Sequence, residues 1–470
     1  MNIQDFGLDE TILLRLLSIA LSQGGDFADI YFQYGTSLSI KMEEDIIKNT
    51  STSILLGVGI RVIDGIQTGY AYTSDLSNEK LVDTARNAAI IAKNQHNISP
   101  KFLQLKNKSK NIYDLQSPVI KAEISEQINL VRDAYNSAKK YDNRITKITS
   151  SLASSYDFIT IANSEGLLIS DERPQTRLMV AATAEDGQNK TTAIANNGGR
   201  AGMEFYKSVE TPESIGKRAS QEAIILLSAR NAPSGELPVV LGSEESGVMI
   251  HEAVGHPLEA DGIWQKTSVM WNKFGEVVAN PNVSIYDDPT IPNYRGSLNI
   301  DDEGCDTENI MLIEKGKIVG FMNDYLSSKL LKHKRNGHGR RESFQSIPIP
   351  RMSNTVLMQG EYSPQEIIES TKYGIYAKSF QGGMVEGTGK FTFSLNLGYL
   401  IENGKLTAPI KNVTLIGMNL DILKNIEMVG NDMGFFLGTC GKQGQSVSVT
   451  SGTPTLKISK MTVGGINGIN

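Results

Sequence analysis

The sequence predicts an α+β protein in which two N-terminal α/β sandwich-like units precede a β-rich C-terminal domain, an open barrel-like antiparallel sheet. Three observations support this prediction. Up to Leu227, apolar stripes of helical spacing alternate with strand-like runs. From Leu237 onward, short strand-like runs are separated by glycine-containing turns. The chain has 470 residues, of which 40% are hydrophobic, and this length exceeds what one compact core usually holds.

The first unit is predicted to comprise residues 1–95. Asp9 is placed to cap a helix, and Gly24-Gly25 ends that helix. Four strand-like runs follow, and Asp64-Gly65 predicts a hairpin turn between the last two. Asn78 then begins a helix with leucine and alanine residues along one face. The four runs are residues 28–34, 38–42, 54–63 and 68–72.

A polar, lysine-rich stretch, residues 96–120, is predicted to be a linker or an exposed loop. Its lysines either form a docking patch or belong to a solvated connection, and the acidic composition of the whole chain favours the solvated connection. The lysines concerned are Lys101, Lys106, Lys108 and Lys110.

The second unit is predicted to comprise residues 121–232. It opens with a helix whose apolar residues, from Ile124 to Tyr135, are spaced by four, three and four and so lie on one stripe. Pro212 stands where a further helix begins, because proline is favoured in the first helical turn. The strand-like runs between the two helices are residues 154–162, 167–170 and 176–184.

The third unit, residues 233–470, is predicted to be rich in β-strands. Gly316 and Asn403-Gly404 mark hairpin turns between successive runs. Ser243 follows a strand-like run and can cap a helix, with Glu244 in its first turn, where the helix dipole favours negative charge. The later runs are residues 310–313, 317–322, 355–358, 390–395, 399–401 and 413–416.

Two of the five histidines, His251 and His256, flank Glu252 on this predicted helix. The common zinc-hydrolase signature places its histidines four residues apart, on one helical face. A spacing of five separates the side chains by about 140° on a regular helix, and one wider π-type turn would bring them together. The stretch therefore predicts a divalent-metal site with a built-in general base, on condition that the helix is distorted there. The alternative is a helix that carries two surface histidines.

Cys440 is the candidate for a third ligand. Glycines on both sides leave its thiol reachable, and Lys442 nearby favours the thiolate. Two histidines and one cysteine leave a fourth position for water, as catalytic zinc sites do. The alternative is that Cys440 is a small buried hydrophobic residue. The chain separates His256 from Cys440 by 184 residues, so only the tertiary fold can bring them together.

With these residues, the sequence resembles the TldD/PmbA family of metallopeptidases, in particular its TldD branch. The resemblance rests on His251-Glu252-x-x-x-His256 together with the Gly-Thr-Cys440-Gly-Lys element, a combination that the PmbA (TldE) branch lacks. It covers essentially the whole chain and is densest from about Pro238 onward. Further matching stretches are Arg295-Gly-Ser297, Asp301-Asp-Glu-Gly304, Gly339-Arg-Arg-Glu-Ser343, Pro350-Arg-Met-Ser-Asn-Thr355, Gly382-Gly383, Tyr399-Leu-Ile-Glu-Asn-Gly404 and Leu456 to Gly465.

Three positions depart from the family pattern. Pro257 stands where glycine is more typical, Cys305 where proline often stands, and Gly417-Met-Asn419 where Gly-Asn-Gly is common. None of them removes a candidate ligand, but Pro257 leaves the local helix geometry open.

The hypothesis is metal-assisted peptide hydrolysis. Zn2+, held by His251, His256 and the Cys440 thiolate, would activate a water, and Glu252 would act as the general base. The resemblance implies that the substrates are peptides or unfolded protein segments, as in leader-peptide maturation and antitoxin turnover. It also implies a dimer, either a homodimer or a heterodimer with a metal-free PmbA/TldE-type paralogue.

Two charged clusters accompany this site. The resemblance includes Arg340 and Arg341, which we expect to hold a substrate carboxylate or to stabilise developing negative charge. Asp301, Asp302 and Glu303 lack the ligand spacing of a calcium-binding loop, so they are predicted to form an exposed loop or to contact basic groups elsewhere.

Charge and composition exclude several functions. A net charge of −6 argues against a nucleic-acid-binding surface. No apolar stretch is long enough to cross a membrane. Acidic residues precede any basic one, which is atypical of a signal peptide, and two cysteines suit a reducing compartment. We therefore expect a cytoplasmic protein without nucleic-acid or membrane partners.

Two rival functions stay open on sequence grounds. The first is a non-enzymatic modulator that binds a toxin, DNA gyrase or another protein. The second is a zinc hydrolase that acts on small amides or esters.

Overall fold

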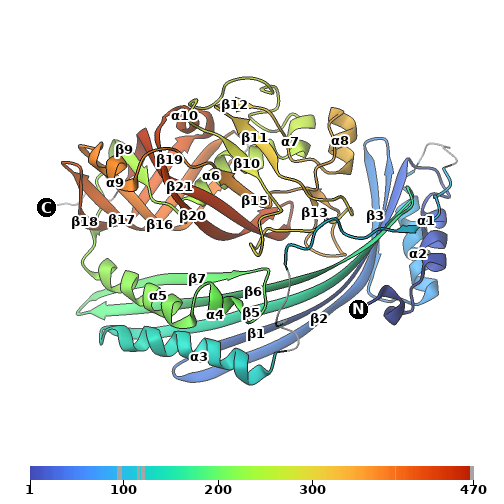
Figure 1. Ribbon diagram of the computed structural model, residues 1–470, viewed down its shortest axis with the longest axis horizontal. Coiled ribbons are helices and arrows are strands. Elements are labelled where there is room, and N and C mark those ends of the chain that lie inside the picture. Colours follow the sequence, from blue (N-terminus) through green and yellow to red (C-terminus); the bar gives the residue numbers. More distant parts are fainter. Residues whose placement is uncertain (93–97, 114–116, 118–121, 387, 466–470) are drawn as a thin grey trace.

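The computed structural model describes residues 1–92, 98–113, 117, 122–386 and 388–465. These residues form a long curved sheet and a second, barrel-containing domain that lies along one face of the sheet (Figure 1). The predicted α+β class is therefore confirmed. Within the described ranges, no helix is long and apolar enough to cross a membrane.

The curved sheet has seven strands in the order β3-β2-β1-β5-β6, and both β7 and the short β4 pair with β6. Strands from the two predicted N-terminal units join in it, because β1 pairs antiparallel with β5 from Asp29↔Asn163 to Glu43↔Thr149. The boundaries at residues 95 and 120 stay predictions, and the sheet continues across them. Its strands are β1 (Phe27–Glu43), β2 (Ile46–Asp64), β3 (Gln67–Thr73), β4 (Gln104–Leu105), β5 (Ile145–Asn163), β6 (Leu167–Asp186) and β7 (Asn189–Gly199).

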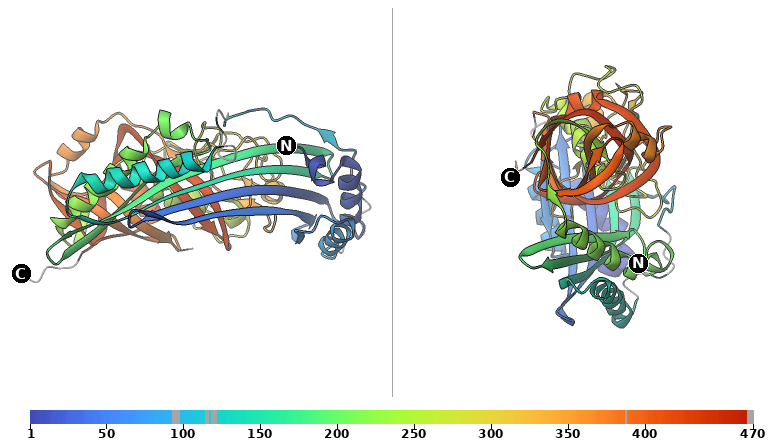
Figure 2. Two further views of the ribbon diagram at one scale, coloured as in Figure 1. Left: turned by 90° about the horizontal axis from the view of Figure 1, so that it is seen from below. Right: turned by 90° about the vertical axis from the view of Figure 1, so that its left-hand side faces the viewer.

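Helices cover one face of this sheet, and the C-terminal domain lies against the other. Successive side chains of β1 point to opposite faces, so they pack alternately against the helices and against that domain. Ile30 and Phe32 pack under α1 and α2 at one end, whereas Ile40 and Met42 pack under α3 and α5 at the other. Tyr31, on the opposite face, packs against the C-terminal domain. Figure 2 shows α3 and α5 lying along the strands. The helices are α1 (Glu10–Ala20), α2 (Asn78–Ala89), α3 (Ile124–Tyr141), α4 (Phe205–Ser208) and α5 (Pro212–Leu227), preceded by the 3-10 turn η1 (Ile3–Phe6).

Five strands of the C-terminal domain close a barrel. Each of the pairings β21–β9, β9–β16, β16–β17, β17–β19 and β19–β21 exists, so the last strand returns to the first. Seen end-on in Figure 2, they form a ring. The barrel-like antiparallel sheet that the sequence predicted is therefore present, but it is closed rather than open, and one of its pairings, β9 with β16, is parallel. These strands are β9 (Gly235–Leu241), β16 (Tyr373–Val385), β17 (Lys390–Glu402), β19 (Val413–Met418) and β21 (Gln445–Gly464).

The remaining elements extend or cover the barrel. β20 pairs with β21 from Gln445 to Ile458, along the part of that strand that precedes its pairing with β19. β15, β10, β11 and β12 continue the sheet from β21 as short strands. The other strands are β8 (Arg230–Asn231), β10 (Ile285–Asp287), β11 (Ile310–Glu314), β12 (Lys317–Ile318), β13 (Gly339–Arg340), β14 (Ile349–Pro350), β15 (Asn354–Leu357), β18 (Lys405–Lys411) and β20 (Ile426–Lys442). The helices are α6 (Gly247–Ile250), α7 (Ala260–Trp264), α8 (Tyr325–Leu331), α9 (Pro364–Glu369) and α10 (Asn419–Lys424), with the turns η3 (His251–Gly255) and η4 (His256–Leu258).

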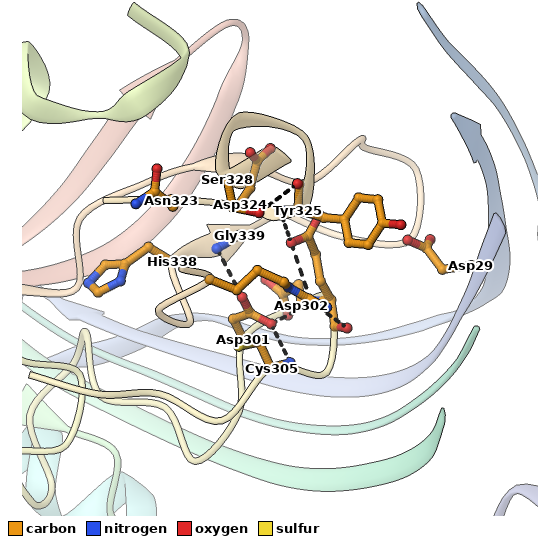
Figure 3. A network of polar contacts seen from close by, with 12 residues as sticks. Asp29, Asp301, Asp302, Cys305, Asn323, Asp324, Tyr325, Ser328, His338 and Gly339 are labelled. Atoms are coloured by element: carbon orange, nitrogen blue, oxygen red, sulfur yellow. Dashed lines mark hydrogen bonds and ion pairs between the residues drawn. The ribbon is translucent and has the colours of Figure 1, made fainter. Parts of the chain in front are cut away.

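Buried ion pairs join the sheet to the C-terminal domain at the acidic cluster of residues 301–303. Figure 3 shows part of this cluster, in which Asp301 accepts hydrogen bonds from the N–H groups of Cys305 and Gly339. Arg61 on β2 binds Asp29 on β1 with Nε 2.9 Å from Oδ2, and its Nη1 lies 2.8 Å from Glu303 Oε1. Arg173 on β6 pairs with Asp302. The acidic cluster is therefore buried and contacts basic groups, and the prediction of an exposed loop is wrong, because arginines distant in the sequence neutralise it.

The described part of the stretch 96–120 also docks on the rest of the protein. Lys106 Nζ lies 2.6 Å from Asp306 Oδ2, and Lys108 Nζ lies 2.8 Å from Asp171 Oδ1. Lys110 donates to the carbonyl of Thr307 at 2.7 Å. These three lysines therefore contact groups of their own chain, which the favoured prediction of a solvated connection did not include, and the docking patch stays a prediction.

Candidate metal centre

The backbone around the two histidines changes its helical type twice. The α-helical turn α6 begins after Ser246, later than the predicted cap at Ser243, because Glu244 has a left-handed backbone (φ 75°) that no helix continues. His251–Gly255 is then a π-helical turn, in which the N–H of His256 donates to the carbonyl of His251. The distortion that the spacing of five requires is therefore present.

Gly255 allows this turn to lie against the neighbouring loop. A Cβ atom at this position would lie 1.8 Å from the sulfur of Met352, a distance that no packing can accommodate. The apolar residues on the opposite side of the turn, Ala253 and Val254, are fully buried in the main core of the C-terminal domain. Packing on both sides therefore holds the histidines in place.

The fold brings His251, His256 and Cys440 together. Their ligand atoms all lie within 4.8 Å of one another, and Cys440 Sγ is 3.4 Å from His256 Nε2. His251 and Cys440 are buried, whereas 19% of the His256 side chain is exposed. Two imidazoles and a thiol are donors that zinc prefers, and the buried Nδ1 of His251 has no hydrogen-bond partner among the described residues. The three residues therefore fit a metal ion.

A buried carboxylate orients His256 from behind. Glu259 Oε2 lies 2.9 Å from His256 Nδ1, which turns Nε2 toward Cys440. Lys442 Nζ binds the same carboxylate oxygen at 2.9 Å and Asp261 Oδ1 at 2.7 Å. Burial opposes the charge of Glu259, but Lys442 and His256 outweigh it and hold the pKa of this carboxyl well below its usual range. A hydrogen-bonded carboxylate of this kind is typical behind metal-binding histidines.

The thiol of Cys440 lies in surroundings that favour its anion. Burial by itself raises the pKa, but His251 and His256 outweigh this effect and lower the pKa to about 5. Lys442, which the sequence suggested as the cause, points instead to Glu259 and Asp261. Arg351 fixes the backbone here, since its Nη2 donates to the carbonyl of Cys440 at 2.5 Å.

Glu252 lies beside the three donor residues and lines the same cleft. Burial raises the pKa of its carboxyl above the ordinary value, and the neighbouring histidines act in the opposite direction. Among the residues that the structure describes, none forms a hydrogen bond to this carboxylate. It is therefore free to accept a proton from a group that enters the cleft.

The cleft over this centre has a volume of about 690 Å³. One wall is the π-helical turn, and another is the end of β20 from Gly438 to Gln443. The end of β16 forms part of the rim, where Gly382, Gly383 and Met384 are exposed. β9 pairs with β16 only from Ile375 to Ala377, so the rim segment extends beyond β9.

The structure places Arg340 and Arg341 away from the cleft, of which neither is a lining residue. Both are buried: Arg340 donates to the carbonyls of Met352 and Ser448, and Arg341 donates to Asp302 O at 3.0 Å. Their role in substrate binding stays a prediction, which these contacts do not favour.

Sequence reasoning missed Glu259 and Asp261, which Lys442 joins to the strand of Cys440. One signal was available for Glu259, because it follows His256 by three residues and lies on the same side of a helical turn. No local pattern indicates Asp261 or Arg351, whose partners are distant in the sequence.

Comparison with known proteins agrees with this geometry. Three models of the PmbA/TldA metallopeptidases match the chain in order: domain 1 at residues 28–92, the central domain at 117–227 and the C-terminal domain at 234–465. The chain is 38% identical to the metalloprotease TldD homolog of Haemophilus influenzae, over 98% of this chain and 97% of that protein. It is 39% identical to the corresponding homolog of Buchnera aphidicola from Schizaphis graminum, over 94% and 93%.

Solved structures share the fold. A putative modulator of a DNA gyrase from Thermotoga maritima superposes with a TM-score of 0.80 at 24% identity, covering 97% of this chain and all of that chain. TldE from Thermococcus kodakarensis superposes with a TM-score of 0.78 at 19% identity, with the same coverage. At these identities the likeness concerns the fold alone.

Proposed function

Because the chain belongs to the PmbA/TldD family of metallopeptidases, in its TldD branch, we propose that it is a zinc-dependent peptidase. Its substrates are peptides or unfolded protein segments. The observation that carries the proposal is the convergence of His251, His256 and Cys440 within 4.8 Å, beside Glu252 and open to a cleft.

His251, His256 and the Cys440 thiolate hold the metal. A zinc ion held there would supply a bound water of lowered pKa and a Lewis acid for the scissile carbonyl. Glu259 keeps His256 in the tautomer whose Nε2 is free to bind, because its carboxylate occupies Nδ1. Arg351 and Lys442 hold the strand of Cys440 from behind.

Glu252 is the general base. Its carboxylate takes a proton from the attacking water and returns it to the amine that leaves. The raised pKa of Glu252 suits this role, since a carboxylate of higher pKa accepts a proton more readily. The absence of hydrogen bonds from the described residues leaves both of its oxygens available.

An extended peptide is the substrate form that the cleft favours. The exposed end of β16 at Gly382 and Gly383 offers backbone groups beside the metal centre. A peptide that adds to this edge is recognised through its main chain, so broad sequence specificity follows. Leader peptides and antitoxins belong to this class of substrate. The active assembly is a dimer, with a second copy or with a metal-free TldE-type paralogue.

The test replaces the proposed base. Glu252→Gln is expected to lower peptide cleavage about 10²- to 10⁴-fold, with bound metal and thermal stability close to wild type. Glu386→Gln is the matched control, because Glu386 also lines the cleft but lies outside the metal-binding turn. Cleavage and metal content are measured on purified protein, with and without the candidate paralogue.

Undiminished cleavage by Glu252→Gln would contradict the assignment of the base. A variant that has lost cleavage but still modulates a toxin or DNA gyrase in cells would favour a binding function. Small amides and esters that are hydrolysed faster than extended peptides would favour the other rival, a small-molecule hydrolase.

A further inference from the structure

Three arginines from separate elements meet between the curved sheet and the C-terminal domain. Arg177 lies on β6, Arg200 directly follows β7, and Arg295 lies in the loop between β10 and β11. The N–H of Arg200 donates to the carbonyl of Asn293 at 2.9 Å, which places Arg200 beside the loop of Arg295.

The hydroxyl group of Ser448 connects β6 with the loop of Arg295. The side chains of Gln175 and Arg295 both donate to Ser448 Oγ, at 2.7 Å and 3.0 Å. Gln175 is two residues before Arg177 and faces the same side of β6. Arg177 and Arg200 therefore both lie close enough to Arg295 for their charges to act on it.

None of these arginines has a carboxylate partner within 4.0 Å among the described residues. Arg177 Nε donates to the amide oxygen of Asn196 at 3.1 Å, and Arg295 Nη2 donates to Ser448. The guanidinium of Arg200 lies over the ring of Tyr113, 5.8 Å from its centroid. These hydrogen-bond and ring partners are neutral, and the carboxylates of Asp171 and Asp157 act on Arg200 only from beyond ion-pair distance.

Burial makes the lack of a negative partner costly. Arg200 and Arg295 are only 6% and 7% exposed, and the Nε atom of each is buried without an acceptor. Arginine is rarely buried to this degree unless it is paired. Burial, with the neighbouring arginines Arg177 and Arg200, lowers the pKa of Arg295 to about 9. By contrast, Arg61 and Arg173 nearby are each paired with carboxylates.

We propose that Arg177, Arg200 and Arg295 form a binding site for an oxyanion, either a carboxylate or a phosphate. The planar guanidinium group matches the two oxygens of such an anion, and three of them can surround it. The hydroxyl of Ser448 supplies a further donor. Arg177 is only half-buried, so the site is open to solvent on its side.

The site lies next to the strand of the metal centre without being part of it. Ser448 on β21 stands opposite Thr439 on β20, which lines the metal cleft and precedes Cys440. Two sources can supply the oxyanion: a free anion in solution, or a carboxylate of a bound polypeptide. They share one chemistry and are separated by experiment.

The first experiment uses inorganic phosphate and the full-length protein. Thermal unfolding is followed in phosphate and in chloride at equal ionic strength. Phosphate at about ten times its Kd is expected to raise the midpoint by about 2 °C. In Arg295→Gln, which removes one of three repelling charges, the midpoint in chloride is expected to rise and the response to phosphate to disappear.

Arg177→Gln provides a second variant, since this half-buried position tolerates substitution more readily than the buried ones. Arg144→Gln is the control, because Arg144 is an exposed arginine that is already paired with Asp142. A phosphate response that is the same in wild type and in both cluster variants is a general salt effect and overturns the proposal. The lack of any response in wild type overturns it as well.

A second experiment, which rests on the proposed peptidase function, identifies the source. Cleavage of one peptide is compared with that of its C-terminal amide, in wild type and in Arg177→Gln. A KM several-fold higher for the amide in wild type alone assigns the site to the carboxylate of the peptide. Equal KM values together with a specific phosphate response assign it to a free anion. Because unfolding does not require catalysis, failure of the peptidase assignment leaves the first experiment valid.

Discussion

The junction between the two domains and the metal centre use charged side chains in opposite ways. At the junction, Arg61 contacts Asp29 and Glu303, so opposite charges neutralise one another inside the protein. At the metal centre, three electron-pair donors face one another, and the charged groups Glu259 and Lys442 lie behind them. A network that is closed on itself stabilises the fold. A set of converging donors can instead bind something from outside the chain.

The largest expected effect concerns the metal centre. Cys440→Ala is expected to lose the bound metal and to lower cleavage on the order of a thousandfold. Its thermal stability is expected to fall modestly, because His251 and His256 lose their interaction with the thiolate, whereas the pair of Glu259 with Lys442 stays in place. Metal content, peptide cleavage and thermal unfolding are measured together.

Cys305→Ala is the control for this variant, because Cys305 is the other free cysteine of the chain and lies at the junction. A Cys440→Ala protein that keeps one metal per chain would remove the contrast between the two regions.

A substitution at the junction is expected to lower the stability of the fold and to leave metal binding unchanged. Glu303→Gln leaves the buried Arg61 and Arg335 with less negative charge, which typically costs about 3 kcal/mol of unfolding free energy. The folded fraction is expected to bind metal as wild type does. Denaturant unfolding measures the loss, and Glu308→Gln at an exposed pair with Lys334 is the control. Equal stability of the two variants would argue against the junction as a stabilising network.

Glu259→Gln tests the connection between charge and metal binding. It removes the charge behind His256 and keeps the shape of the side chain, so the affinity for zinc is expected to fall about 10- to 100-fold. Competition with a chelator measures this affinity. Asp261→Asn is the matched control, because Asp261 binds Lys442 as Glu259 does but does not contact His256. Equal losses in both variants would assign the effect to Lys442 rather than to the orientation of His256.

The last prediction concerns the pH dependence of stability at the junction. Burial, followed by the charge of Glu303, raises the pKa of Asp324 from 3.8 to about 7. The folded state then binds this proton more tightly than the unfolded state. The stability that Asp324 contributes is therefore fully present below about pH 4 and is lost as the pH rises through about 7.

Asp324→Asn is expected to lack this decline, because asparagine stays neutral and can still cap α8. The measurement is the unfolding free energy of wild type and variant between pH 4 and pH 8. Parallel curves would show that Asp324 titrates normally.

The sequence predicted the metal centre better than it predicted the strands around it. The spacing of His251 and His256 indicated a π-type turn, because helical geometry is local and its angles are known. The long strands β20 and β21 were not predicted, since their glycines and small polar residues have a low propensity for strands. Gly434 on β20 shows why one of these positions requires glycine: a Cβ atom there would lie 2.4 Å from the backbone nitrogen of Glu244.

The burial of the acidic cluster, residues 301–303, also could not be predicted from local sequence patterns. Nothing near Asp302 in the sequence indicates that it is buried, because its partner Arg173 precedes it by 129 residues. Pairing across such distances is a property of the tertiary fold. Local patterns therefore predicted the longer helices α1, α2, α3 and α5, the hairpin turn at Asp64-Gly65 and the two histidines, whereas the residues that join the domains needed the structure.

The central claim is that His251, His256 and Cys440 bind one metal ion. X-ray absorption at the zinc edge of the zinc-loaded protein tests it most directly. The account predicts one sulfur neighbour at about 2.3 Å and two imidazole nitrogens at about 2.0–2.1 Å, with the sulfur absent in Cys440→Ala and present in Cys305→Ala. A first shell of nitrogen and oxygen alone in the wild type would contradict it.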